Sequence, residues 1–223
     1  MGEFVKLTAS DGHVLDAYVA KPAGEPIAGL VVVQEIFGVN THIRAVADGY
    51  AKDGFLVVAP ALFDRFERGV DIGYEGADME KAMSLVPKLD IAAIEKDTAA
   101  AVAYAREQSG KKTGIIGYCL GGSIAWLAAA KLPVDAAVGY YGGMIAQFAD
   151  ASLKVPIILH FGRQDAHISE ADRNKIATAH PEVPIYLYDA GHGFNCDMRQ
   201  AFDAASAKLA RERSLEFLKK NLA

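Results

Sequence analysis

The sequence predicts an α/β protein built on a mostly parallel, twisted sheet with helices on both faces. Apolar, β-branched runs alternate with helical patterns along the chain, which is the arrangement of parallel βαβ units. The length of 223 residues suits one such domain, and 52% hydrophobic with 23% charged residues is typical of a globular protein. We therefore expect residues 1–223 to form one domain around one sheet.

Eight apolar runs are expected to be strands. Gly12 lies in the SDG segment between the first two runs, where it can adopt the positive φ of a tight turn, so these two runs predict a hairpin. The run that begins at Gly29 is continuous and β-branched, as in a strand buried on both faces. The eight runs cover residues 4–9, 13–20, 29–38, 55–62, 113–119, 135–141, 155–162 and 184–190.

Helical patterns fill most of the segments between the later strands. The first has apolar side chains at helical spacing, with Asn40 or Thr41 as its N-cap. The second forms one or two helices, because it is interrupted near Pro87. The expected helices cover residues 40–54, 75–109, 123–131 and 199–222.

Composition and charge exclude several classes of partner. The net charge is −5 and no basic block occurs, so no nucleic-acid partner is expected. No run approaches the ~20 apolar residues that span a bilayer, and the N-terminus lacks the pattern of a signal peptide. We therefore expect a cytoplasmic protein with no membrane partner, in which Cys119 and Cys196 are free thiols. The sequence defines no oligomeric state and is compatible with a monomer.

Four chemically useful side chains follow strands at the edge where ligand sites form in such sheets. Glu35 and Cys119 lie at the ends of the third and fifth predicted strands, and Asp165 and His192 lie just after the seventh and eighth. A nucleophile, an acid and a histidine in that order along the chain are the order of an α/β-hydrolase catalytic triad. The sequence thus predicts the α/β-hydrolase fold.

The segment GYCLGG (117–122) predicts a nucleophile on a sharp turn from strand to helix. A lone buried cysteine is more often a small hydrophobic residue, and the acid and the histidine are what favour catalysis by Cys119. Glycines around it leave room for the strained turn, and the N-terminus of the following helix favours the thiolate. The backbone N–H of Leu120 is the expected oxyanion donor, with Ile36 N–H as the second.

The histidines differ in their surroundings along the sequence. His192 lies in the glycine-flanked loop AGHGF, whereas His160 lies in an apolar strand and His167 lies too near Asp165 to need it as a separate partner. We expect His192 to be the base and Asp165 to fix its tautomer, although GRQD is also typical of a turn. No chemical role is expected for His13, His42 and His180.

Five segments, QEIFGVN, GYCLGG, AVGYYGG, GRQDAHI and AGHGF, resemble the dienelactone hydrolase family over nearly the whole chain. The resemblance implies an α/β-hydrolase that hydrolyses a cyclic or activated ester, and the thiol chemistry of Cys119 leads us to expect an acyl-thioester intermediate. It implies Cys119 as nucleophile, His192 as base and Asp165 as the residue that orients it. It also implies that Glu35 pairs with the resting thiol and controls its ionisation, which like-charge repulsion makes physically reasonable.

The sequence departs from the family where the substrate carboxylate is held. The family has an arginine four residues after the catalytic histidine, where this chain has Cys196, and the second arginine position falls on Met79. An unpaired buried anion is costly, so a neutral ester is expected to bind at least as well, unless Arg65 or Arg68 of the candidate lid (63–78) reaches the site. The pocket is expected to be walled by Phe37, Tyr140 and Tyr141, each of which is also typical of a core aromatic.

A second class of function remains open at this stage. A redox sensor or binding protein could use the Cys119 thiol without turnover. No cofactor and no metal are expected, since no cluster of histidine, cysteine and carboxylate has ligand spacing and no phosphate-binding loop follows the first strand.

Overall fold

The computed structural model describes residues 2–223 and contains one eight-stranded sheet. The strands lie in the order β1-β2-β4-β3-β5-β6-β7-β8, with β1 and β2 antiparallel to their neighbours and the other pairs parallel. The predicted hairpin and α/β-hydrolase fold are therefore confirmed. The strands are β1 Glu3–Thr8, β2 Val14–Ala20, β3 Ala28–Val33, β4 Phe55–Pro60, β5 Thr113–Tyr118, β6 Ala136–Tyr140, β7 Ile157–Gly162 and β8 Ile185–Tyr188.

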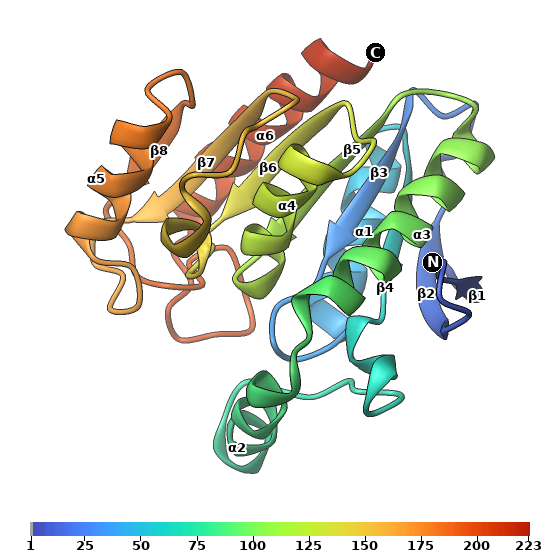
Figure 1. The fold of residues 1–223 in the computed structure, drawn as a ribbon, viewed down its shortest axis with the longest axis horizontal. Helices are drawn as coiled ribbons and strands as arrows, with labels where there is room; N and C mark the ends of the chain where they lie inside the picture. Colours follow the sequence, from blue (N-terminus) through green and yellow to red (C-terminus); the bar gives the residue numbers. More distant parts are fainter. Residues whose placement is uncertain (1) are drawn as a thin grey trace.

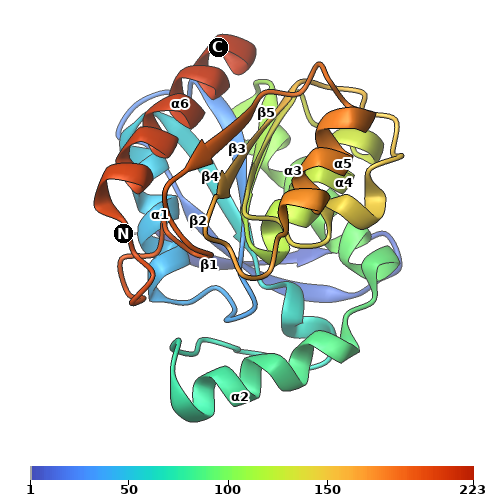
Figure 2. The ribbon, with the colours of Figure 1, turned by 90° about the vertical axis from the view of Figure 1, so that its left-hand side faces the viewer.

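Helices cover both faces of the sheet. In Figures 1 and 2, α3, α4 and α5 lie on one face and α1 and α6 on the other, while α2 lies beyond the edge toward which β3 points. The central strands β3 to β7 are buried along their whole length, as continuous apolar runs require. The helices are α1 Thr41–Lys52, α2 Gly76–Leu85, α3 Ile91–Ser109, α4 Leu120–Lys131, α5 Glu170–Ala179 and α6 Ala204–Leu222.

Side-chain caps account for several helix ends. Asn40 caps α1 by accepting a hydrogen bond from Ile43 N–H, as expected. The predicted break near Pro87 separates α2 from α3. Helix α5 was not predicted, although Ser169 and Asp172 form a capping box at its start. Within residues 2–223, no helix has both the length and the apolar character to cross a bilayer.

Two helix boundaries differ from the prediction in ways that matter for the site. Helix α4 begins at Leu120, three residues earlier than expected, so it starts directly after Cys119. Helix α6 begins at Ala204 instead of residue 199, because Asp203 caps it by accepting from Ser206 N–H. Residues 199–203 consequently belong to a loop at the strand-end edge.

The candidate lid (63–78) is partly tied to the body of the protein. Arg65 makes a bidentate contact with the fully buried Asp97 of α3, at 2.7 and 2.9 Å. Arg68 contacts Asp64 at 3.3 Å and the hairpin carbonyl of Val14. Both arginines are engaged in these contacts in this structure, so neither offers a free positive charge to a substrate carboxylate.

Replacing Asp97 by Asn should destabilise the protein by about 1–3 kcal/mol, because Arg65 loses its buried partner and keeps only the more exposed Asp11. Urea denaturation measures the change. The control is Lys6→Ala, which removes an exposed ion pair with Asp16 and should change stability little. Equal effects of the two substitutions would contradict the role given to the Arg65–Asp97 pair.

Candidate active site

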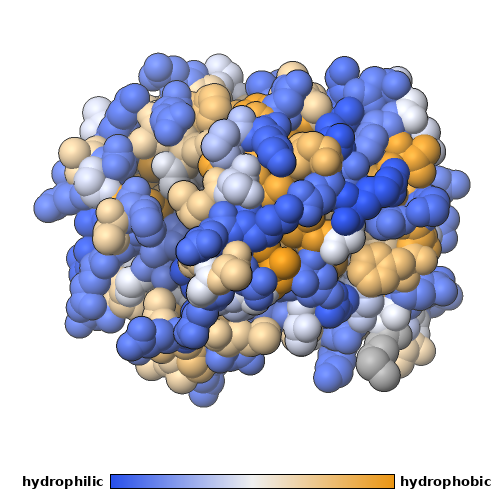
Figure 3. Space-filling model, turned by 90° about the horizontal axis from the view of Figure 1, so that it is seen from below, coloured by the Kyte–Doolittle hydropathy of each residue, from blue (hydrophilic) through white to orange (hydrophobic). Residues whose placement is uncertain are grey.

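Cys119 lies on a strained turn between β5 and α4. Its φ of 53° and ψ of −111° are rare for a residue with a side chain. A Cβ atom on Gly117 would lie 1.9 Å from the carbonyl oxygen of Gly121, and one on Gly121 would lie 2.3 Å from that of Val33. Only glycines permit this close approach, and it leaves the thiol partly exposed at the strand-end edge. Figure 3 views the molecule from this edge, where hydrophobic side chains lie between larger hydrophilic areas.

The turn also holds two backbone N–H groups in position. Gly121 N–H donates to the carbonyl of Gln34 at 3.0 Å, which ties the start of α4 to the loop after β3. Within residues 2–223, no acceptor is paired with the N–H of Leu120 or with that of Ile36. Unpaired N–H groups are what the predicted oxyanion hole needs, and the role of Leu120 and Ile36 in it stays a prediction.

His192 and Asp165 form a hydrogen-bonded pair. His192 Nδ1 lies 2.8 Å from Asp165 Oδ2, and His167 N–H donates to the other carboxylate oxygen at 2.8 Å. Burial alone would raise the pKa of Asp165, but these hydrogen bonds lower it overall. Burial alone would lower the pKa of His192, but the hydrogen bond with Asp165 and the nearby Cys119 raise it to about 10. The surroundings of the ring thus favour its protonated form.

His160 is a core residue, as its apolar strand suggested. Its Nδ1 lies 2.7 Å from the Tyr188 hydroxyl and its Nε2 lies 3.0 Å from Ser214 Oγ. Burial lowers the pKa of His160 to about 3, so the ring stays neutral. Tyr140, expected to wall the pocket, belongs to this core as well, because its hydroxyl contacts Ser214 at 2.7 Å and its ring packs on His160.

Tyr141 and Phe37 lie beside the site. The ring of Tyr141, whose φ is 37°, lies 5.1 Å from that of His192, and its buried hydroxyl has no hydrogen-bond partner among the described residues. Burial and the nearby Glu35 raise the pKa of Tyr141 well above its usual value. Phe37 packs against Tyr74 in a small apolar cluster that also contains Cys196.

Glu35 lies at the base of the site. Its side chain is fully buried, and neither carboxylate oxygen has a hydrogen-bond partner among residues 2–223. The nearest positive charge is Arg199, with Nη1 3.6 Å from Glu35 Oε1. Burial, followed by the nearby Glu35, raises the pKa of the Cys196 thiol to about 11, so this second cysteine is not ionised at neutral pH.

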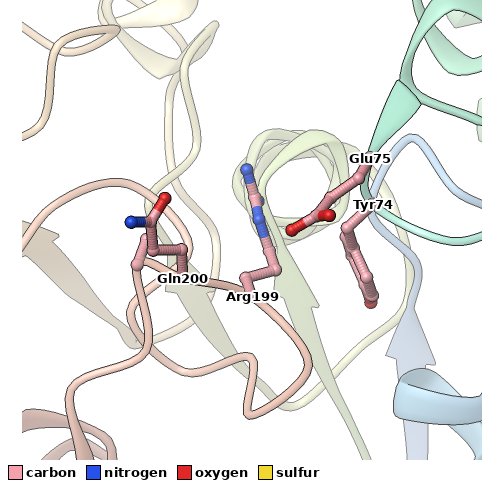
Figure 4. Close-up of a pocket in the computed structure, with 5 residues that line it drawn as sticks. Tyr74, Glu75, Arg199 and Gln200 are labelled. Carbon is pink, nitrogen blue, oxygen red and sulfur yellow. The ribbon is translucent and has the colours of Figure 1, made fainter.

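Arg199 is the site residue that the sequence analysis missed. Its guanidinium lies 5.7 Å from the ring centre of Phe37 and 5.6 Å from that of Tyr74. A Cβ atom on Gly193, next to His192, would meet the guanidinium at 2.5 Å. Figure 4 shows Arg199 between Gln200 on one side and Glu75 and Tyr74 on the other; these residues and Ala201 line a cavity of about 490 Å³.

The cationic side chain near the site therefore comes from the loop 199–203. The sequence pattern predicted a helix from residue 199, so Arg199 was not considered as a residue of the strand-end loop, whereas the helix begins at Ala204. Arg199 adds a positive charge next to the apolar cluster that contains Cys196 and Met79, the residues at the two family arginine positions.

The sheet order and the histidine, acid and thiol at its strand ends are those of an α/β-hydrolase. The sequence signature of the dienelactone hydrolase family matches residues 15–222. The carboxymethylenebutenolidase of Pseudomonas putida is 37% identical over 225 residues, which is 97% of this chain and 95% of that protein. The chain belongs to the dienelactone hydrolase family and is an ester or lactone hydrolase.

Solved structures agree with this assignment. The crystal structure of a putative dienelactone hydrolase from Klebsiella pneumoniae subsp. pneumoniae has a TM-score of 0.86 to this chain at 28% identity, with 97% of each chain covered. A dienelactone hydrolase-like promiscuous phosphotriesterase from metagenomic libraries has a TM-score of 0.79 at 19% identity, covering 100% of this chain and 99% of that one, and shares the fold. Membership of a hydrolase family favours turnover over the redox-sensor alternative.

The raised pKa of His192 predicts a pH-dependent contribution to stability. The unfolded ring loses its proton near pH 6.5, whereas the folded ring keeps it to about pH 10, so the stabilisation is complete below about pH 6.5 and is lost as the pH rises through about 10. The variant His192→Gln lacks this contribution at every pH. Its destabilisation relative to the unmodified protein, measured by urea denaturation, should be largest near pH 6 and should shrink toward pH 10. A penalty independent of pH would contradict the assignment.

Proposed function

We propose that the protein hydrolyses its ester or lactone through Cys119, His192 and Asp165 and an acyl-thioester intermediate. The observation that carries this proposal is the thiol of Cys119 on a strained strand-to-helix turn, near enough to His192 to raise the pKa of the ring, which Asp165 holds at 2.8 Å. This is the arrangement of an activated nucleophile, its base and the residue that orients the base.

The steps follow from the positions of these groups. When substrate is bound, His192 holds the proton shared with the thiol as an imidazolium, and the Cys119 thiolate sulfur forms a bond with the carbonyl carbon. The resulting oxyanion accepts hydrogen bonds from the N–H groups of Leu120 and Ile36. As the tetrahedral intermediate collapses, the carbon–oxygen bond of the ester breaks and the leaving oxygen takes the proton from His192. Water, deprotonated by His192, then attacks the thioester; the acid is released and the proton returns to the sulfur.

We propose that Glu35 disfavours the free thiolate by like-charge repulsion until substrate binds. Its full burial and its unpartnered oxygens support an electrostatic role, because an uncompensated carboxylate acts strongly on nearby charges in a medium of low dielectric. Arg199, at 3.6 Å, compensates this charge only in part.

The substrate class follows from Arg199. We propose that it binds a carboxylate on the substrate, with Phe37 and Tyr141 on the apolar sides of the pocket. An arriving carboxylate would draw the guanidinium away from Glu35, with which it makes no hydrogen bond in this structure. A carboxylate-bearing lactone of the dienelactone type is therefore favoured over the neutral ester. We also propose a cytoplasmic location, where a thiol nucleophile stays reduced.

Cys119→Ala should abolish hydrolysis of both a dienelactone and a neutral aryl acetate, because no other thiol can form the acyl intermediate. The matched control is Cys196→Ser, which alters the other free cysteine and should retain turnover. Steady-state kcat/KM measures both. Substantial activity in Cys119→Ala, or a loss confined to Cys196→Ser, would contradict the proposed nucleophile.

Arg199→Gln should lower kcat/KM for the dienelactone relative to the aryl acetate by about 10- to 100-fold, the worth of a charged hydrogen bond. The kcat/KM values for the two substrates are compared as a ratio, because a change in the reactivity of the thiol or in Glu35 would affect both values alike. Arg68→Gln is the control, because Arg68 is half-exposed and contacts the hairpin instead of the site. An unchanged ratio in Arg199→Gln would identify the neutral ester as the preferred class.

A further inference from the structure

Three metal-binding side chains meet beside the triad without belonging to it. One carboxylate oxygen of Glu35, one ring nitrogen of His42 and the sulfur of Cys196 all lie within 4.8 Å of one another. All three side chains are buried. They come from the loop after β3, the first turn of α1 and the loop before α6, so only the folded chain brings them together.

Polar atoms in this cluster lack ordinary partners. Within residues 2–223, His42 Nε2 and both oxygens of Glu35 are buried with no hydrogen bond. Buried polar atoms are normally paired, and an unpaired one in a native structure indicates either strain or a missing ligand. Three such atoms in one place point to a ligand that would satisfy them together.

The other nitrogen of His42 is held as in many metal sites. His42 Nδ1 lies 3.1 Å from Asp197 Oδ1, and donation to this carboxylate leaves the Nε2 lone pair free. Asp197 directly follows Cys196, so one short loop supplies both a sulfur and the carboxylate that orients the ring. The cluster also adjoins a cavity of about 360 Å³, whose lining includes His42, Asn195 and Asp197. Of the three side chains of the cluster, only His42 lines this cavity.

We propose that Glu35, His42 and Cys196 bind a divalent cation of the zinc class. One sulfur, one imidazole nitrogen and one carboxylate oxygen suit zinc or cobalt, whereas magnesium and calcium prefer oxygen alone. Three protein ligands leave the fourth tetrahedral position to water. This site makes no use of Cys119, His192 or Asp165 but shares Glu35 with the proposed control of the thiol. Metal titration therefore tests it separately from the hydrolysis assays.

Binding requires defined local changes. Tetrahedral zinc, with bonds of about 2.0–2.3 Å, holds its ligand atoms about 3.3–3.7 Å apart, so the three ligand atoms must draw together by up to about 1.5 Å. The thiol of Cys196 gives its proton to solvent as the sulfur–metal bond forms. Thiolate and carboxylate then carry two negative charges that balance the cation. Arg199, 3.6 Å from Glu35, opposes the ion, so reversible binding is expected instead of a permanent structural site.

The test is titration of the full-length protein with Zn²⁺ by calorimetry and with Co²⁺ by absorption spectroscopy. We expect one Zn²⁺ per chain and, with Co²⁺, a thiolate-to-metal charge-transfer band. Cys196→Ser should abolish the band, and His42→Gln should weaken Zn²⁺ binding by at least about 10-fold. Cys119→Ala, which removes the other thiol, should keep both the band and the affinity.

Substitutions of the buried residues Cys196 and His42 could impair folding, so a variant of an exposed residue is tested as well. Asp197 is 69% exposed, so Asp197→Asn should fold normally and yet weaken Zn²⁺ binding by about 10- to 100-fold through the orientation of His42. Absence of stoichiometric Zn²⁺ binding would overturn the proposal. So would a cobalt band that survives in Cys196→Ser and disappears in Cys119→Ala, since the catalytic thiol would then be the ligand.

Discussion

The active site depends on the close approach between the β5–α4 turn and the end of β3. Glycines at 117 and 121 let the start of α4 lie against the carbonyls of Val33 and Gln34, where a single Cβ atom would clash. This contact forces the left-handed conformation of Cys119, and it sets the thiol beside the loop that carries Glu35 and Ile36. The strained backbone of Cys119 therefore persists because the packing of the surrounding sheet and helix holds it in place.

Glu35 joins the two chemical regions of this edge. Its buried carboxylate is the only anion paired with Arg199 among the described residues, it raises the pKa of Cys196, and it is one of the three proposed metal ligands. A substrate carboxylate on Arg199 and a cation on Glu35 would each change the charge that the nucleophile experiences. Occupancy of either position would therefore alter the electrostatic control of Cys119, because a low dielectric transmits such changes with little screening.

The sequence predicted those features that depend on local pattern. Apolar runs marked all eight strands, and the ends of β3, β5, β7 and β8 placed Glu35, Cys119, Asp165 and His192 at one edge. Features set by tertiary contacts were missed. Arg199 was assigned to a helix because helix-forming residues follow it, whereas the Asp203 cap starts the helix five residues later. The cluster of residues 35, 42 and 196 has no sequence spacing that could reveal it.

His160 and His192 show why residue type and strand position alone do not assign a catalytic role. His160 in β7 and His192 after β8 come from neighbouring strands, yet burial lowers the pKa of the first to about 3, while hydrogen bonds raise that of the second to about 10. The difference arises from the partners: His160 meets the neutral hydroxyls of Tyr188 and Ser214, and His192 meets a carboxylate. A neutral network stabilises an uncharged ring that packs, whereas the Asp165 carboxylate stabilises the protonated ring that general-base chemistry must form.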